Sequence, residues 1–410
     1  MTKMRPRFYL PAELVKITVM PETHSPRLVK VTLHAIFFLS GITTVLIGQV
    51  LPIFARHFSL NDLQASYFFP AQFAGSLAGT YFTSLFARRN AFLAATVIGG
   101  ILMATGVLLM NVDLFSVCLV GFLINGLGVG MTLPSINMLI LEMNTDRPGA
   151  ALNILNFCWG LGAILSKPFV DLFSTADTIG LTTFVLAAPL FAATFLLFVA
   201  TGKKQASPAH ASEANETDAI PIWTMPIAWM IAIFNFIHVG FESGIGGWLT
   251  TYTGRLDGQP LLHWISPTLL YFSFFVIGRG VAPVLFRFLN ENKMLMLGLM
   301  IVLTGMILTL SAGTVIGLSL GASVAGFGTS WLFPTNVARF SRTFGPTATR
   351  RATPLFICGT LGAASSTWLI GFISDKTGSL RSGMFVLIVA VLLLIVLQIG
   401  LSLRRPVVAD

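Results

Sequence analysis

Long apolar runs separated by short polar breaks are the main pattern along the chain. Twelve of these runs reach about 20 residues, the length at which an α-helix crosses the hydrocarbon core of a bilayer. The pattern therefore predicts spanning helices at 31–54, 63–86, 91–111, 114–142, 152–173, 179–201, 222–253, 265–288, 294–312, 314–340, 353–373 and 383–403. Residues 202–221 form the one long polar interruption, and their Pro, Ser, Ala and charged residues predict a flexible cytoplasmic linker.

Six runs on each side of this linker predict an all-α membrane protein with twelve transmembrane helices in two six-helix bundles. The expected bundles are residues 31–201 and 222–403, with cytoplasmic tails at 1–30 and 404–410. Composition supports this class, because 55% of the residues are hydrophobic and only 10% are charged. A soluble domain carries about 25% charged residues.

The two halves also resemble one another. Two glycines and a proline in the fourth run recur 200 residues later in the tenth, and a Leu-Gly-Ala triplet of the fifth run recurs at the same offset in the eleventh. The matched positions are Gly126, Gly128 and Pro134 with Gly326, Gly328 and Pro334, and 161–163 with 361–363. Parallel repeats of this kind predict pseudo-symmetric bundles that bind a solute near the midplane and rock to give alternating access.

The net charge of +9 is distributed asymmetrically. With the N-terminal tail placed in the cytoplasm, 19 of the 25 Lys and Arg residues fall on the cytoplasmic side and four on the other, while Lys167 and Arg279 lie within spans. The positive-inside rule describes this asymmetry, so we expect both termini in the cytoplasm and a bacterial inner-membrane location. The basic charge therefore indicates topology in a lipid bilayer and no nucleic-acid partner.

The sequence contains no motif that predicts an enzyme. The three cysteines lie within apolar runs and show no metal-ligand spacing. The chain contains no Gly-Lys-Ser/Thr loop for ATP and no nucleophile–base pattern. We therefore predict a protein that is not an enzyme and that binds no metal or cofactor.

Residues 235–252, inside the seventh run, hold the strongest candidate site. Asn235, His238 and Glu242 are spaced i, i+3, i+7 and share one helix face. A carboxylate in hydrocarbon is costly unless it faces protein, water or a partner, so Glu242 is a candidate for solute binding and proton coupling, with His238 as a relay. Trp248 and Tyr252 follow, and they suit either a sugar-stacking face or the membrane–water boundary.

Other polar residues within spans each admit two interpretations. Arg279 is either a solute contact or the ion-pair partner of Glu242 on the neighbouring helix. Lys167 and Asp171 have the i, i+4 spacing of an intrahelical salt bridge, although a Lys167 that faces the cavity would favour anionic solutes. The remaining candidates either contact a solute or join helices: Gln72, Asn137, Asn153, Asn156, Trp159, Asn235, Trp331 and Asn336.

These features resemble those of the major facilitator superfamily. Arg88 and Arg89 remain of its basic signature between the second and third spans, and GFISDKTGSLRSG contains a Ser-Asp-x-x-Gly-Ser pattern of many members. HVGFESGIGGWLTTY, NMLILEMNTDRPGAALNILNFCWGLGA and the pair Gly278-Arg279 are similar to the fucose/glucose/galactose symporters and the sodium-dependent glucose transporter-like proteins. The proton-coupled relatives use acids in the first and fourth spans, whereas here the first has none and the fourth only Glu142.

The resemblance implies a monomeric transporter that works by alternating access on a small polar solute such as a sugar. A proton or a sodium ion is the candidate co-substrate. Two alternatives remain open. An exporter of drugs or organic anions would have a wider, more apolar cavity in which Lys167 or Arg279 recognises ligand charge. A receptor or lipid-flipping protein could use the same fold, although no long polar segment predicts a soluble domain.

Overall fold

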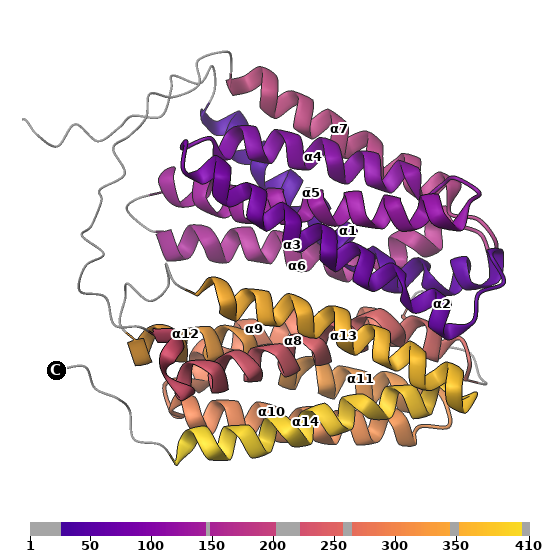
Figure 1. The fold of residues 1–410 in the computed structure, drawn as a ribbon, viewed down its shortest axis with the longest axis vertical. Coiled ribbons are helices and arrows are strands. Elements are labelled where there is room, and N and C mark those ends of the chain that lie inside the picture. Colours follow the sequence, from indigo (N-terminus) through magenta and orange to yellow (C-terminus); the bar gives the residue numbers. More distant parts are fainter. Residues whose placement is uncertain (1–25, 145–147, 202–221, 257–264, 345–351, 404–410) are drawn as a thin grey trace, which may run out of the picture.

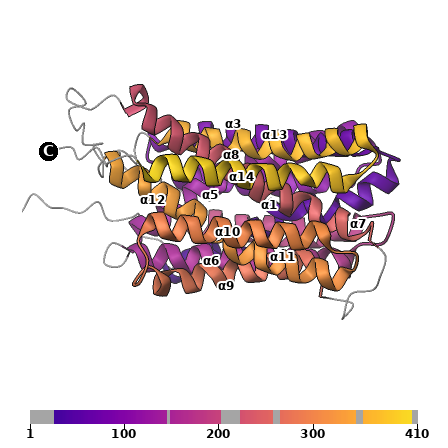
Figure 2. The same ribbon diagram turned by 90° about the horizontal axis from the view of Figure 1, so that it is seen from below.

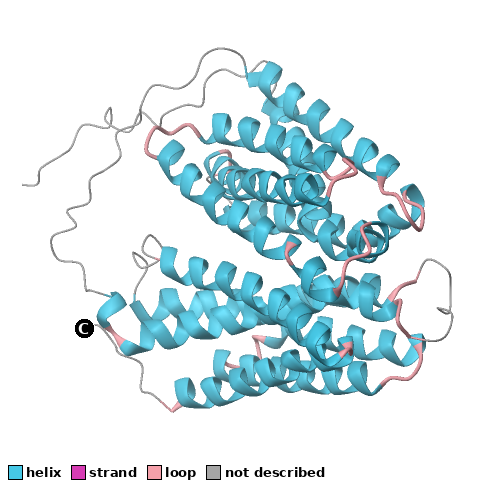
Figure 3. Cartoon of the chain, turned by 45° about the vertical axis from the view of Figure 1, so that its right-hand side comes forward, coloured by secondary structure: helices cyan, strands magenta, loops and turns pink. Residues whose placement is uncertain are grey.

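The computed structural model describes residues 26–144, 148–201, 222–256, 265–344 and 352–403. Within these ranges every regular element is a helix (Figure 3). The predicted linker and C-terminal tail lie outside the described residues, as does the predicted N-terminal tail up to residue 25.

The helices form two groups that follow the order of the chain (Figure 1). The first group comprises α1 (Pro26–His57), α2 (Asp62–Ser66), α3 (Phe68–Ala87), α4 (Phe92–Leu109), α5 (Phe115–Glu142), α6 (Pro148–Phe173) and α7 (Gly180–Thr201). The second follows a 3-10 turn at Ile222–Thr224 and comprises α8 (Pro226–Thr253), α9 (Pro267–Leu285), α10 (Glu291–Ser311), α11 (Val315–Thr329), α12 (Leu332–Phe344), α13 (Thr353–Thr377) and α14 (Leu380–Ser402). Helices pack mainly within their own group, which confirms the two-bundle prediction.

All twelve predicted spans are helical in the described residues. Ten of them are long and apolar enough to cross a membrane, judged by length and composition, when α11 and α12 are counted as one span. The other two of the twelve are α3 and α6. The helix ends differ from the predicted ones by a few residues; α1, for example, begins at Pro26 and not at residue 31. The second predicted span is divided into α2 and α3, and the tenth, predicted over 314–340, into α11 and α12.

The tenth span is divided next to a proline, although the equivalent proline of the first half lies in an unbroken helix. Pro134 and Pro334 have no N–H, so the carbonyls four residues earlier, those of Gly130 and Ser330, have no helical partner. In α5 the Gly130 carbonyl accepts a hydrogen bond of 3.2 Å from the Thr83 hydroxyl of α3, and the helix continues through its proline. In the second half the chain leaves the helix at 330–331 before α12 begins.

Glycine contacts confirm the pseudo-symmetry of the halves. Gly162 of α6 lies against the backbone carbonyl of Phe38 in α1, where an added Cβ would come within 2.1 Å of the oxygen. Gly362 of α13 lies in the same way against Phe236 of α8, at 1.9 Å. Only glycine permits backbones to approach this closely. The same relation holds for Gly126 on Gln72 and for Gly326 on Tyr271.

The boundary between the halves is formed by α1, α2, α3 and α6 on one side and by α8, α9 and α13 on the other. Helices α10 and α14 pack together on the side of the second half that lies away from the first (Figures 1 and 2). We call the end of the molecule where α1 begins and α14 ends the inner end, and the opposite end the outer end.

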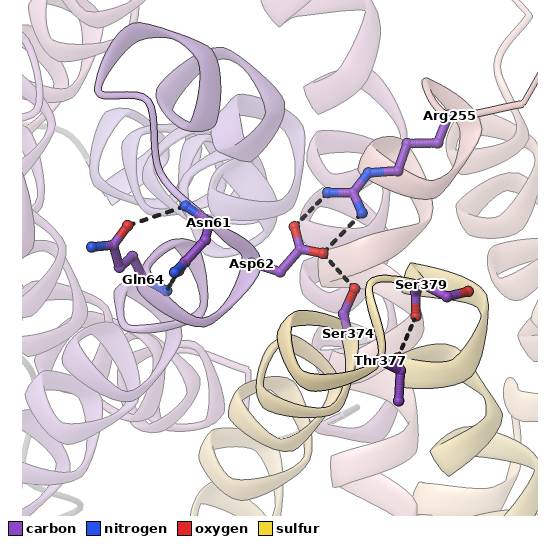
Figure 4. A network of polar contacts seen from close by, with 7 residues as sticks. All are labelled: Asn61, Asp62, Gln64, Arg255, Ser374, Thr377 and Ser379. Atoms are coloured by element: carbon purple, nitrogen blue, oxygen red, sulfur yellow. Dashed lines mark hydrogen bonds and ion pairs between the residues drawn. The ribbon is translucent and has the colours of Figure 1, made fainter.

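The outer ends of the two halves are joined through Asp62 at the start of α2 (Figure 4). Its carboxylate accepts two hydrogen bonds from the Arg255 guanidinium, just beyond α8, and one from the Ser374 hydroxyl of α13. Asn61 and Gln64 form a capping box that fixes the first turn of α2, so the Asp62 carboxylate is held in place.

Candidate functional site

Two cavities lie along the boundary between the halves. The outer cavity has a volume of about 540 Å³ and is lined by the ends of α1, α6 and α8 and the start of α9. The inner cavity has a volume of about 600 Å³ and is lined by the start of α6, the end of α9 and the break between α11 and α12. The middle of α6 contacts the middle of α9 between them, at Gly160 and Val276. Both volumes are typical of small-molecule sites.

Neutral polar groups from both halves line the inner cavity. Asn153 and Asn156 of α6 are exposed, and the Asn156 amide nitrogen donates to a backbone carbonyl of its own helix at 2.9 Å. Its side-chain oxygen therefore remains available to a ligand. From the other half, Ser330, Trp331 and Thr335 line the same cavity. The Ser330 and Thr335 hydroxyls donate to carbonyls of their own chain segment, so the exposed Asn153 and Asn156 amides are the groups of this wall that suit a polar, uncharged ligand.

Arg279 of α9 brings a positive charge to the inner cavity. Its Nε donates to the Ser330 carbonyl at 3.4 Å, and its guanidinium carbon lies 4.3 Å from the centre of the Phe275 ring. No described carboxylate forms an ion pair with it. The other charged residues of the cavity wall neutralise each other, because Arg342 pairs with Glu291 at 2.6 Å.

Glu242 and His238 lie together in the middle of α8. The His238 side chain is fully buried and the Glu242 side chain is 26% exposed; His238 Nε2 and Glu242 Oε2 are 3.4 Å apart. Neither ring nitrogen has a hydrogen-bond partner in the described residues. Glu242 is close enough to Arg279 to act on it electrostatically. The described residues show no ion pair between Glu242 and Arg279; the Glu242 carboxylate lies beside His238, which forms an ion pair with it only when protonated.

Three of the predicted solute contacts instead join helices. Asn235 is buried and donates to the Leu355 carbonyl of α13 at 2.9 Å. Asn336 is buried and donates to the Ile231 carbonyl of α8 at 3.2 Å. Gln72 is buried in the first half, and its amide nitrogen lies 3.3–3.5 Å from the Thr43 and Thr44 carbonyls and the Asn125 side chain. The amide nitrogen of each side chain is thus bonded to a neighbouring helix, whereas the three amide oxygens are buried and have no hydrogen-bond partner among the described residues.

The remaining predicted contacts differ in their surroundings. Trp331 lines the inner cavity, and its indole donates to the Met294 carbonyl at 2.9 Å. Trp159 is half-buried in the middle of α6, where its backbone carbonyl contacts Gly41. Asn137 is half-buried on α5 and donates to a carbonyl of its own helix at 2.8 Å.

Trp248 and Tyr252 occupy neither of the positions expected for them. Both are buried, and the Trp248 indole donates to the Thr367 carbonyl of α13 at 3.0 Å. The Trp248 ring also lies 5.9 Å from the ring of Phe69 in the first half. The prediction of a sugar-stacking face or a membrane boundary was therefore wrong for this tryptophan, because its ring packs between helices and joins the halves.

The outer cavity contains the intrahelical salt bridge that the spacing predicts. Lys167 pairs with Asp171, and both line the cavity. Nearby, the Thr250 hydroxyl donates to the Gln49 side chain across the boundary at 2.7 Å and lies 2.8 Å from the Thr268 hydroxyl. The Lys167 charge is thus balanced within its own helix.

Comparison with known families decides the class of the protein. The family model described as Major Facilitator Superfamily matches residues 33–356. The chain belongs to the major facilitator superfamily. It is accordingly a multi-pass membrane transporter and not an enzyme, as the sequence predicts.

Solved structures of other major facilitators share its fold. A D-xylose-proton symporter matches with a TM-score of 0.74 and 14% identity over 93% of this chain and 98% of its own. A peptide transporter, POT, in complex with sulfate has a TM-score of 0.72 and 15% identity over 91% and 94%. The E. coli fucose:proton symporter FucP has a TM-score of 0.59 and 18% identity over 92% and 98%. A search of proteins with curated functions gave no match.

Several residues of the inner cavity in this major facilitator were not among the predicted ones. Ser330, Thr335 and the Glu291–Arg342 pair line it together with Arg279. A sequence signal existed for Ser330, because Pro334 stands four residues later and frees its carbonyl. No comparable signal marks Thr335, since a threonine in a helix ordinarily bonds its own backbone, as this one does to residue 331.

Proposed function

We propose that this major facilitator transports a small, hydroxyl-rich solute such as a sugar. The observation that carries the proposal is the wall of the inner cavity, where the exposed amides of Asn153 and Asn156 from one half face a lining from the other half that includes Ser330 and Thr335. Each amide can donate to one solute hydroxyl and accept from another. A solute held from both halves changes the relative stability of their arrangements, which a carrier requires.

The proposed mechanism is alternating access. In this conformation the outer ends of the halves are held together by Asp62, Arg255 and Ser374, and the inner cavity takes its lining from both halves. The solute would exchange with the side that the inner end faces, which we expect to be the cytoplasm. Passage to the other side requires the Asp62 contacts to break while the inner ends approach each other.

Proton coupling through Glu242 and His238 is the second part of the proposal. Adding a proton to this pair removes the negative charge of the carboxylate or places a positive charge on a fully buried imidazole. Either event changes the electrostatic balance on a helix that contacts the first half. The proton symporters for xylose and fucose among the structural neighbours support a proton, in preference to sodium, as the co-substrate.

The proposal also concerns the place of the protein in the cell. We propose a monomer in a bacterial inner membrane with both termini in the cytoplasm, because the described residues have more Lys and Arg at the inner end than at the outer end.

Solute binding can be tested by thermal unfolding of the purified protein with sugars, sugar acids and lipophilic ions. We expect hydroxylated solutes to raise the melting temperature, and Asn156→Ala to reduce this rise. Asn111→Ala, an exposed change at the outer end, should leave it unaltered. Stabilisation only by lipophilic cations or by lipophilic carboxylates would favour the exporter of drugs or organic anions instead.

Coupling can be tested with the protein in liposomes that carry an imposed pH gradient. We expect the gradient to drive accumulation of the solute by the natural protein. Glu242→Gln should abolish accumulation while exchange of labelled for unlabelled solute continues, because exchange needs no net proton movement. Asp177→Asn, an exposed change at the outer end, serves as the control. Undiminished accumulation by Glu242→Gln would refute the role of this carboxylate.

A further inference from the structure

We infer that Arg279 binds a carboxylate group of the transported solute. The solute would then be a hydroxylated carboxylate, such as a sugar acid, and not a neutral sugar. This inference rests on the proposed function and narrows its solute class. Three observations lead to it: the comparison of the two halves, the geometry of the guanidinium, and the charges that line the inner cavity.

The first half shows that the structural task of Arg279 needs no charge. A proline frees one carbonyl in each half, that of Gly130 and that of Ser330. The first lies 3.2 Å from the neutral hydroxyl of Thr83 on α3, which also reaches the Gly79 and Met131 carbonyls. The second accepts from Nε of Arg279 on α9, the equivalent helix of the repeat. A guanidinium within a membrane protein is costly to desolvate. Its presence where a threonine would suffice indicates a second task.

The geometry of Arg279 leaves two donors for that task. Nε is occupied by the Ser330 carbonyl, and the Phe275 ring covers one face of the guanidinium. No acceptor among the described residues engages the two terminal nitrogens, and Arg279 belongs to the wall of the inner cavity. A planar guanidinium fixed at one edge and on one face presents parallel N–H groups that match the two oxygens of a carboxylate.

The charges around the inner cavity favour the same ligand. Glu291 is already paired with Arg342, and Glu242 acts on Arg279 electrostatically without forming an ion pair with it, so the guanidinium has no bonded carboxylate in the described residues. In the outer cavity, by contrast, Lys167 has Asp171 as its partner on the same helix. Asn153 and Asn156 remain for the hydroxyl groups of the same solute. The inner cavity thus combines one cationic donor pair with neutral polar groups, the complement of a hydroxylated carboxylate.

Two ligands with the same hydroxyl groups test the inference. D-glucuronate and D-glucuronamide differ in the replacement of a carboxylate by a neutral amide. We expect calorimetry with the natural protein to give a Kd for glucuronate roughly tenfold to a hundredfold lower than for the amide, because hydrogen bonds to a charged group are the stronger kind. The ratio of the two Kd values should fall to about one in Arg279→Gln.

Two further variants control this experiment. Arg287→Gln removes an equal charge from an exposed position two residues beyond the end of α9 and should leave the ratio unchanged. Arg279→Lys keeps the charge but loses the planar fork, so a reduced preference for glucuronate should remain. If Arg279→Gln does not fold, the ratio of the two Kd values is compared between the natural protein and Arg279→Lys. An equal ratio in the two proteins would then overturn the inference.

The possible failures are distinguishable. Equal affinity for the two ligands in the natural protein, or a preference that survives Arg279→Gln, overturns the inference and leaves the proposed transport of neutral hydroxylated solutes standing. If no hydroxylated compound binds, charged or neutral, the proposed function fails and the inference with it. Binding of a carboxylate without hydroxyls through Arg279 would keep the anion site but overturn the hydroxylated solute class.

Discussion

Replacing Asp62 with asparagine removes the charge that joins the two halves at the outer end. The natural carboxylate accepts two hydrogen bonds from Arg255, one of them 2.8 Å long, and one from the Ser374 hydroxyl (Figure 4). Asparagine has nearly the same shape, so the packing of α2 should persist. Its amide has only one oxygen and can retain at most part of this network.

The size of the effect follows from the exposure of the two partners. A hydrogen bond to a charged group contributes about 1.5–3 kcal/mol when buried, whereas an exposed ion pair contributes about 0.2–1 kcal/mol. The Asp62 side chain is 12% exposed and that of Arg255 is 44% exposed, so an intermediate value of about 1–2 kcal/mol applies. Since about 1.4 kcal/mol is a factor of ten, the population with an open outer end should rise by about five- to thirtyfold.

Distances between spin labels can measure this shift. Val112 and Lys376 are exposed at the outer ends of opposite halves, and labels there require a background in which Cys118, Cys158 and Cys358 are replaced. We expect Asp62→Asn to increase the share of long distances between the labels.

The control for this measurement is Asp177→Asn, which makes the same chemical change at an exposed position of the outer end. It should leave the distance distribution unaltered. An unchanged distribution for Asp62→Asn, or an equal shift in the control, would refute the argument that these bonds close the outer end.

Three further predictions concern packing and topology. Gly362→Ala should destabilise the protein by about 1–3 kcal/mol in a thermal or denaturant titration, because its Cβ would meet the Phe236 carbonyl, whereas Gly280→Ala, with nothing within 4 Å, should be neutral. Thr83→Val should cost about 1–3 kcal/mol in the same titration by leaving a buried carbonyl unpaired, while the exposed Thr80→Val should change little. A fluorescent protein fused to the C-terminus should fluoresce if that end is cytoplasmic, and its darkness together with an active periplasmic reporter at the same site would contradict the positive-inside assignment.

The sequence alone determined the helices, their grouping and the repeat. Each depends on local information: the length of an apolar run fixes a span, and the spacing of glycines fixes where backbones can touch. The salt bridge between Lys167 and Asp171 was predictable for the same reason, since i, i+4 neighbours meet on any helix.

Only the tertiary structure decided which polar side chains meet a cavity. Asn235 and Asn156 are both asparagines in spans, yet one bonds a neighbouring helix and the other faces the inner cavity. Likewise Trp248 packs between the halves, and the Glu242 carboxylate lies beside His238 and forms no ion pair with Arg279 in the described residues. A polar group inside a membrane must be satisfied, but helix, partner half and cavity can each satisfy it equally well. The choice depends on how the two halves are placed against each other, and that placement is set by contacts between residues far apart in the chain.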